Sequence, residues 1–263
     1  LIGFPALLLL LDVGNTNTVL GLYEGEQLVL SWRLTTERQR TTDEYGILCR
    51  NLFELADVRW DAITAIAIAS VVPPLNHTLR RMSVVYFGVE PLFIDPATNS
   101  GMPVRYNPPA DVGADRIVNG VAAFARYGGP CVVVDFGTAT TFDAISRDGE
   151  YLGGVICPGV MVSAEALFAR AARLPRVEIA RPEAVVGTST VGSIQSGLYF
   201  GYVGLVDGIL RRMLEELGPG TKVIATGGLA SLIGKGTDLI ETIDPDLTLE
   251  GLRLIYVRNR AEG

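Results

Sequence analysis

The chain has 263 residues, 48% of them hydrophobic, and a formal net charge of −7 at pH 7. This composition is typical of a globular protein with one large domain or two small ones. The acidic balance argues against a general nucleic-acid binder, because such proteins carry a basic surface. The densest basic clusters are the pairs Arg80-Arg81 and Arg211-Arg212. ATP binding is still possible, since Mg²⁺ and backbone N–H groups supply local positive potential.

The three cysteines, Cys49, Cys131 and Cys157, are odd in number and widely spaced. This pattern predicts reduced thiols in a cytoplasmic protein, and neither a disulfide framework nor a zinc site. The apolar run from Ile2 to Leu11 is too short to cross a bilayer and lacks the charged start of a signal peptide. We therefore expect a buried central strand there, and no association with a membrane.

Further elements follow from hydrophobic periodicity and from glycine and proline punctuation. Helices are predicted over residues 42–56, 75–87, 115–127, 160–173, 191–217 and 227–233. Strands outside the repeat described next are predicted over residues 62–71, 90–94, 222–225 and 252–257. Strands that alternate with helices indicate an α/β fold with mixed sheets.

Residues 8–18 recur in character at residues 131–141, 123 residues later. Each copy is an apolar strand, then Asp-x-Gly, then a threonine-rich turn, and each is followed by a predicted hairpin. The alternative is two unrelated hairpins that both use Asp and Gly in turns. We interpret the pair as an ancient duplication with a boundary near residue 112, giving domains 1–112 and 113–263.

The turn from Asp12 to Thr18 combines a carboxylate at a strand end with backbone and hydroxyl donors. Such a concavity suits phosphate oxygens, and the carboxylate suits a hydrated Mg²⁺. A single turn of this kind is more often a plain hairpin, so the second copy strengthens the interpretation. Residues 228–236 miss the P-loop pattern by one residue and by a Gly at the Ser/Thr position, and no G-x-G-x-x-G follows a strand.

Gly113-Ala114-Asp115-Arg116 stands at the start of a predicted helix. Asp in the first turn is ordinarily a favourable helix start. The functional alternative is a carboxylate that accepts a hydroxyl proton beside a guanidinium that binds a substrate carboxylate. The helix N-terminus should lower the pKa of Asp115 and weaken it as a base, although phosphoryl transfer asks little of the base beyond orienting the hydroxyl.

Two glycine-rich turns, residues 153–159 and 225–228, each follow a strand and precede a helix. Glycine there permits close backbone approach to a ligand, but a tight connection needs it equally. His77 is the only histidine and lies just after Pro73-Pro74. We expect it at the surface or at a helix start, which argues against histidine-based hydrolysis or metal chemistry.

Together these motifs resemble those of the type III pantothenate kinases, members of the acetate/sugar kinase, Hsp70 and actin superfamily. The resemblance runs from about Leu8 to Ala230. Its pieces are Asp12 to Thr16, Tyr106 followed by Gly113 to Arg116, Asp135 to Thr141, Gly153 to Gly159, and Thr226 to Gly228. The chain departs from the usual family pattern only in the segment Leu1 to Ala6, ahead of the first strand.

The resemblance implies a duplicated actin-like (ribonuclease H-like) fold, with two domains of mixed sheets flanked by helices and a cleft between them. It implies ATP-dependent phosphorylation of pantothenate to 4′-phosphopantothenate, the first step of coenzyme A biosynthesis. It also implies a cytoplasmic homodimer whose substrate pocket lies near the subunit interface. The expected cofactors are ATP with Mg²⁺ and a monovalent cation, K⁺ or NH₄⁺.

The same family pattern assigns the site residues. The expected nucleotide contacts are Asp12, Val13, Gly14, Asn15, Thr16, Asn17, Thr18, Val19 and Thr138. The expected pantothenate contacts are Tyr106, Gly113, Ala114, Asp115, Arg116 and Thr190. By the same resemblance Asp115 is the base, Asp12 lies near Mg²⁺, and Asp135 is the ligand of the monovalent cation.

Three alternatives stay open at this point. A kinase of the same fold could act on another small alcohol such as a sugar, although a sugar has no carboxylate for Arg116. A non-catalytic relative, such as a transcription accessory factor, would be expected to lack one of Asp12, Asp115 and Asp135, and all three are present. A phosphatase or ATPase of the same superfamily would release phosphate without needing an alcohol.

Overall fold

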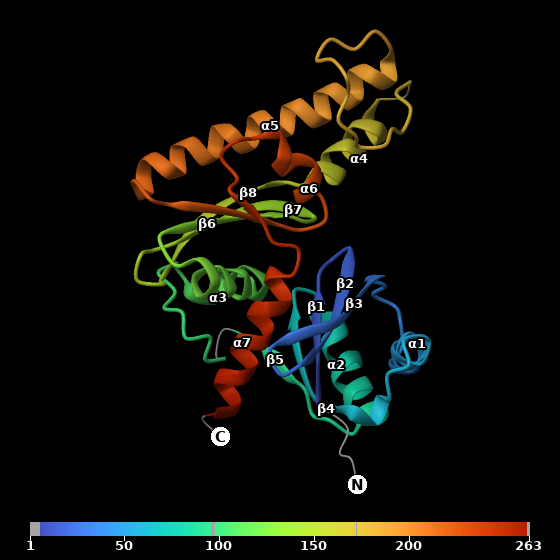
Figure 1. The fold of residues 1–263 in the computed structure, drawn as a ribbon. Helices are drawn as coiled ribbons and strands as arrows, with labels where there is room; N and C mark the ends of the chain where they lie inside the picture. Colours follow the sequence, from blue (N-terminus) through green and yellow to red (C-terminus); the bar gives the residue numbers. More distant parts are fainter. Residues whose placement is uncertain (1–5, 96–97, 172, 262–263) are drawn as a thin grey trace. The chain divides into compact units, whose positions relative to one another are not determined.

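Two five-stranded mixed sheets form the framework of the protein (Figure 1), seen in a computed structural model that describes residues 6–95, 98–171 and 173–261. The strands are β1 (Leu7–Val13), β2 (Asn17–Glu24), β3 (Gln27–Thr35), β4 (Ile63–Ser70), β5 (Leu92–Ile94), β6 (Cys131–Phe136), β7 (Ala139–Ile145), β8 (Tyr151–Pro158), β9 (Lys222–Thr226) and β10 (Thr242–Ile243). The helices are α1 (Thr42–Leu55), α2 (Pro73–Met82), α3 (Ala114–Tyr127), α4 (Val160–Arg170), α5 (Thr190–Leu217), α6 (Ala230–Ile233) and α7 (Leu247–Ala261).

The two sheets have the same topology. The first has the order β3-β2-β1-β4-β5, and the second, taken in the same sense, has the order β8-β7-β6-β9-β10. β1 pairs antiparallel with β2 and parallel with β4. In the same way, β6 pairs antiparallel with β7 and parallel with β9. The predicted α/β class with mixed sheets is therefore confirmed, and the sheet order matches a duplicated unit.

The two Asp-x-Gly turns differ in length by one residue. Asp12 pairs with Val19 across the first hairpin, whereas Asp135 pairs with Thr141 across the second. Corresponding residues of the two copies are therefore 123 positions apart up to the aspartates, and 122 positions apart after the turns. The structural counterpart of Thr18 is therefore Thr140, and both side chains are fully buried.

The chain forms two compact units. The first comprises residues 1–101, 107–121 and 248–263, and the second comprises residues 102–106 and 122–247. The C-terminal helix thus belongs with the first sheet, and the short segment 102–106 belongs with the second. The boundary between residues 112 and 113 concerns the duplicated halves of the sequence, and it stays a prediction.

The core of the first unit lies on both faces of its sheet. Leu9 and Leu11 of β1 pack on one face with α1 and α2, and Leu8 and Leu10 pack on the other with α3 and α7. Successive strand residues point to opposite faces, so a strand covered on both sides reads as a continuous apolar run. The predicted central strand is confirmed from Leu7, and its first residues, up to Pro5, lie outside the described residues.

The prediction of a strand over residues 252–257 is wrong, because these residues lie in α7. The buried side chains of α7 recur at Leu249, Leu252 and Ile255, which is helical spacing, and they pack on the sheet face that carries Leu8 and Leu10. Gly251 lets the helix approach α3, since a methyl group there would lie 2.0 Å from the carbonyl oxygen of Val118. These contacts are tertiary, so a short window of sequence does not show them.

In the second unit α5 runs along the sheet (Figure 1), and its residues Tyr199, Val206 and Leu210 share a buried cluster with Phe142 of β7. Ser189 caps this helix by accepting a hydrogen bond from Gly192 N at 3.1 Å. The predicted helix over residues 227–233 shortens to the single turn α6, and β10 was not predicted. Among the described residues, no helix is long and apolar enough to cross a membrane.

Candidate functional site

The first Asp-x-Gly turn is a tight backbone loop with an open outer edge. Gly14 N donates to Asn17 O at 3.0 Å, and Thr36 N donates to Thr16 O at 2.9 Å, so main-chain bonds define the turn. Asn15 and Thr16 are exposed. Such a loop can present backbone N–H groups and short polar side chains to phosphate oxygens.

The side chains of this turn divide between inner and outer positions. Thr18 is fully buried, and its Oγ1 lies 2.8 Å from Oγ1 of Thr36. It therefore braces the loop and presents no hydroxyl outward. Asp12 is half-buried and pairs in register with Val19, on the sheet face that carries Leu10. The turn therefore has one partly exposed carboxylate, that of Asp12, near the end of β1.

The Gly113–Arg116 motif has a geometric explanation at the start of α3. Oδ1 of Asp115 accepts a hydrogen bond from Arg116 N at 2.9 Å, so the carboxyl group folds back on its own helix start. A methyl group on Gly113 would lie 2.5 Å from this oxygen. With any side chain at this position, the carboxyl group would have to move away. Arg116 follows as a buried residue with 7% of its surface exposed.

Burial raises the pKa of the Asp115 carboxyl group above its ordinary value, although the backbone hydrogen bond and the Arg116 charge act in the opposite direction. The sequence argument that the helix N-terminus weakens this group as a base is therefore wrong, because desolvation outweighs it. A carboxylate with a raised pKa accepts a proton more readily near neutral pH.

The end of β1 and the start of α3 are connected through Val71. Val71 N donates to Val13 O at 3.1 Å, and a methyl group on Gly113 would lie 3.9 Å from Cγ1 of Val71. The first turn and the Gly113–Arg116 motif thus lie at the same end of the first unit. A cavity of about 590 Å³ adjoins the start of the Gly113–Arg116 motif, and Val71, Gly113 and the exposed His77 are among its lining residues. His77 is an exposed residue of α2, so its predicted position at the surface is confirmed.

In the second unit two glycine-rich motifs converge on the second Asp-x-Gly turn. A methyl group on Gly227 would lie 2.5 Å from Oδ1 of Asp135, and one on Gly159 would lie 2.2 Å from the carbonyl oxygen of Thr138. Gly159 N also donates to Thr138 O at 3.1 Å. Gly159 and Gly227 are therefore needed for close packing against this turn. The side chain of Thr138 is exposed and can reach a ligand.

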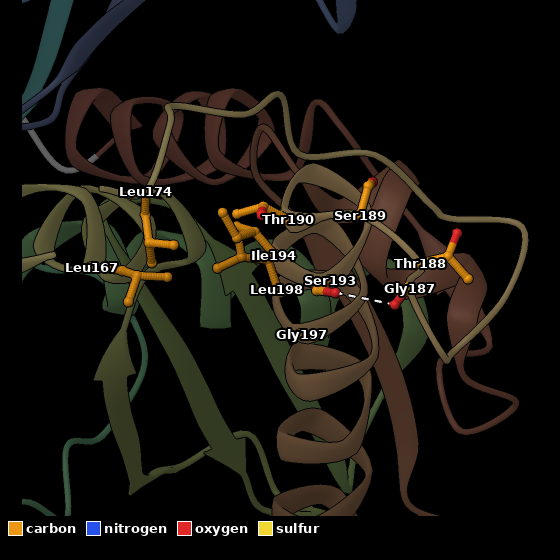
Figure 2. A pocket seen from close by; sticks show the side chains of 10 residues that line it. All are labelled: Leu167, Leu174, Gly187, Thr188, Ser189, Thr190, Ser193, Ile194, Gly197 and Leu198. Atoms are coloured by element: carbon orange, nitrogen blue, oxygen red, sulfur yellow. Dashed lines mark hydrogen bonds between the residues drawn. The ribbon is translucent and has the colours of Figure 1, made fainter. Parts of the chain in front are cut away.

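Tyr106 and Thr190 also belong to the second unit, on different elements. Tyr106 is half-buried, and its ring lies against that of Tyr151, with centroids 6.4 Å apart. Thr190 is the exposed first residue of α5 and lines a cavity of about 740 Å³. Figure 2 shows this cavity between leucine and isoleucine side chains on one side and hydroxyl groups on the other, with Ser193 donating to Gly187 O at 3.3 Å.

The carboxylates do not form a ready-made metal cage. Among the residues that the structure describes, no group of three or more His, Cys, Asp and Glu could hold a metal ion. This fits Mg²⁺, which usually keeps several waters and uses one or two carboxylates together with substrate phosphates. Asp12 is half-buried beside the first turn, and its carboxylate has chemistry that suits that role. The half-buried Asp135 carboxylate has oxygens that would suit a monovalent cation.

The three thiols agree with the expectation of reduced cysteines. Cys49 and Cys131 are buried, Cys157 is half-buried, and all three are free. Burial raises the pKa of Cys49 and of Cys131 to about 12. They are therefore protonated and unreactive at neutral pH.

Sequence reasoning missed two features of the second unit. The apolar wall of the larger cavity, which includes Leu167 and Leu174, reads in sequence as ordinary helix and loop. The other is a fully buried pair in which Tyr151 Oη donates to Oδ1 of Asp143 at 2.8 Å. An aspartate between Phe142 and Ala144 is the only sequence signal for it.

Comparison with known proteins gives one family. The model of the type III pantothenate kinase family matches residues 8–212. A type III pantothenate kinase from Koribacter versatilis is 57% identical, with 97% of each chain covered. One from Myxococcus xanthus is also 57% identical, over 97% of this chain and all of that protein.

Solved structures show the fold. A protein from Campylobacter jejuni with the provisional name Baf family transcriptional activator has a TM-score of 0.60 at 21% identity, covering 96% of this chain and 99% of that one. The ethanolamine utilization protein EutJ from Carboxydothermus hydrogenoformans has a TM-score of 0.55 at 13% identity, covering 96% and 91%. At these identities the likeness concerns architecture alone. With the repeated sheet topology, it confirms the duplicated actin-like fold.

The raised pKa of Asp115 predicts a pH-dependent effect on stability. The folded state favours the protonated carboxyl group, so its contribution to stability is present at low pH and is lost as the pH rises through the folded pKa. We expect Asp115→Asn to raise the thermal unfolding midpoint at pH 7.5, with a gain that shrinks toward pH 4. Calorimetry across this range checks it, with Asp148→Asn, in the exposed β7–β8 turn, as the control. A variant less stable than wild type at pH 7.5 would contradict the expectation.

Proposed function

The chain belongs to the type III pantothenate kinase family, and on that premise we propose how it transfers the γ-phosphoryl group of ATP to pantothenate. The product is 4′-phosphopantothenate, which belongs to coenzyme A biosynthesis. The observation that carries the assignment of roles is the carboxyl group of Asp115, held against Gly113 at the start of α3 with a raised pKa. The roles below are built outward from it.

The two Asp-x-Gly turns bind the nucleotide phosphates in this proposal. The first turn, Asp12 to Val19, offers backbone N–H groups and the exposed Asn15 and Thr16, and Thr138 offers an exposed hydroxyl from the second. The buried Thr18 contributes through its backbone and by bracing the loop against Thr36. The two turns are proposed to face each other across a cleft between the duplicated domains 1–112 and 113–263.

Two cations complete the proposed nucleotide site. Mg²⁺ would be held by Asp12, water and the phosphates, and it would neutralise charge that develops on the transferring phosphoryl group. K⁺ or NH₄⁺ would be held by Asp135, whose carboxyl group lies close to the backbone of Gly227. Neither role requires a preformed cluster of ligands.

Asp115 orients the alcohol and takes its proton. The pantothenate hydroxyl oxygen attacks the γ-phosphorus as its proton passes to a carboxylate oxygen of Asp115. The bond from the γ-phosphorus to the bridging oxygen breaks, ADP leaves, and the proton is later released to solvent. The raised pKa of Asp115 supports its role as proton acceptor.

The other acceptor contacts divide between the two units. Arg116 would bind the pantothenate carboxylate, since a guanidinium forms paired hydrogen bonds with a carboxylate. Gly113 and Ala114 would lie along the substrate through their backbone. Tyr106 would offer an aromatic surface. Thr190 would reach the substrate from the N-terminus of α5, where it lines the larger cavity (Figure 2).

A homodimer in the cytoplasm is part of the proposal. Large apolar side chains are exposed between residues 152 and 191 of the second unit, at Leu152, Ile156, Met161, Val162, Leu167, Val185, Val186 and Val191. Gathered on one surface, these side chains would favour association with a second copy of the chain. Sedimentation equilibrium checks the dimer, and a monomer at micromolar concentration would contradict it. The free thiols fit a reducing compartment.

The first test is a coupled assay with ATP, Mg²⁺, K⁺ and pantothenate. We expect pantothenate-dependent ADP release, and we expect Asp115→Asn to lower kcat by about 10²-fold or more, the usual effect of a lost base. Asp148→Asn, an exposed aspartate, serves as the matched control and should keep wild-type turnover. Near-normal kcat in Asp115→Asn would remove the base assignment. ADP release on hexoses or without any alcohol would favour a sugar kinase or an ATPase.

The proposed binding of the pantothenate carboxylate by Arg116 can be tested with a substrate analogue. Pantothenyl alcohol has the same hydroxyl as pantothenate but no carboxylate. We expect Arg116→Gln to raise the KM for pantothenate about tenfold or more, because a charged hydrogen-bonded pair is lost. The same variant should leave kcat/KM for pantothenyl alcohol within about threefold of wild type. Equal losses on both substrates would show that Arg116 acts otherwise.

The monovalent cation is tested by exchange of salt. We expect turnover in K⁺ or NH₄⁺ to exceed turnover in Na⁺ at equal ionic strength, because these larger cations give up bound water more easily than Na⁺. Asp135→Asn should weaken the response to K⁺ by removing the charged ligand. The measurement is initial rate against K⁺ concentration for both proteins. Full rate in Na⁺ alone would contradict the role given to Asp135.

A further inference from the structure

The segment around Tyr106 joins the edge of the second sheet. Val104 forms an isolated parallel bridge with Tyr151, the first residue of β8. Arg105 N donates to Tyr151 O at 2.8 Å, and Tyr151 N donates to Pro103 O at 2.9 Å. The Arg105 guanidinium also bonds the carboxylate of Glu150, with Nε to Oε1 at 3.0 Å. The backbone that carries Tyr106 is therefore attached to β8 just before the tyrosine.

Tyr151 is itself held from inside the sheet. Its Oη donates to Oδ1 of Asp143 at 2.8 Å, and Thr141 Oγ1 donates to the other carboxylate oxygen at 3.2 Å. Asp143 and Tyr151 are both fully buried. A buried carboxylate is costly unless it accepts hydrogen bonds, so this pair has one strongly preferred arrangement. The Tyr151 ring is therefore a rigid surface.

The ring of Tyr106 packs on that surface. The two ring centroids are 6.4 Å apart with an interplanar angle of 58°, which is a favourable tilted arrangement. The Tyr106 ring also lies over Gly153, where a methyl group would be 3.6 Å from Cδ2. Gly153 has a φ of +126°, which side-chain-bearing residues rarely adopt. The Tyr106 ring thus packs on a surface formed by the Tyr151 ring and the backbone of Gly153.

We propose that the buried Asp143–Tyr151 pair is a positioning element for pantothenate binding, because it fixes the ring of Tyr106 before the substrate arrives. The inference rests on the proposed function, in which Tyr106 contacts the acceptor. Preorganising a contact residue lowers the ordering cost of binding and therefore acts on affinity. Asp143 and Tyr151 act through Tyr106 and need not touch the substrate.

The test is Tyr151→Phe, which keeps the ring and removes the hydroxyl donor. We expect the KM for pantothenate to rise about three- to tenfold, with kcat within about twofold and the KM for ATP unchanged. Tyr127→Phe is the matched control, because it removes the same atom from a second tyrosine–aspartate pair of this unit, in which Tyr127 Oη donates to Asp244 at 2.7 Å. It should leave all three constants unchanged.

A double-mutant cycle shows whether the effect passes through Tyr106. In a Tyr106→Ala background we expect Tyr151→Phe to change the pantothenate KM less than twofold, because the ring that it positions is gone. A KM effect of equal size in both backgrounds, or none in the wild-type background, would overturn the inference alone. Absence of pantothenate turnover in the wild-type protein would instead overturn the proposed function and this inference with it.

Hydrogen exchange tests the same idea without any substitution. The amides of Arg105 and Tyr151 form the backbone hydrogen bonds that join the segment 102–106 to β8. Both amides should therefore exchange slowly in the wild-type protein without pantothenate. Exchange at open-chain rates that slows only when pantothenate is added would show that the segment is ordered by the substrate. That result would also overturn the proposal, whatever the fate of the Tyr151→Phe variant.

Discussion

Two aspartate side chains in this protein lie against backbone that has no room for a side chain. Oδ1 of Asp115 would be 2.5 Å from a methyl group on Gly113, and Oδ1 of Asp135 would be the same distance from one on Gly227. Glycine at each position leaves the space that the carboxyl group occupies, and for Asp115 the main-chain N–H of Arg116 also donates to Oδ1 at 2.9 Å. The proposed base and the proposed cation ligand both depend on this close approach.

Burial of the Asp115 carboxyl group disfavours its charged form. The Arg116 N–H group and charge favour the carboxylate, yet burial is the larger effect and raises its pKa. A structural cap at a helix start would gain from ionisation, whereas this group loses stability by it. Catalytic carboxylates are commonly placed in such surroundings. The same physical effect therefore connects local packing, pH-dependent stability and the proposed proton transfer.

The two duplicated units share one framework, and small differences between them give their turns different exposed side chains. The sheets share strand order and direction, but the first turn is one residue longer than the second. Asn15 and Thr16 are exposed on the first turn and Thr138 on the second, while Thr18 and Thr140 occupy matching buried positions. The segment 102–106 joins β8 of the second copy, which gives Tyr106 its support.

The sequence by itself determined the α/β class, the repeated Asp-x-Gly hairpins and the family, because these depend on residue type and spacing within short segments. It predicted most elements for the same reason, from the apolar run of β1 to the 28-residue helix α5. It failed at residues 252–257, where an apolar window fits either a strand or a helix until packing on Leu8 and Leu10 decides. Only the tertiary structure could show that burial outweighs the helix N-terminus at Asp115, and that Asp143 supports Tyr151. Both depend on desolvation and on contacts between distant segments, which local spacing does not encode.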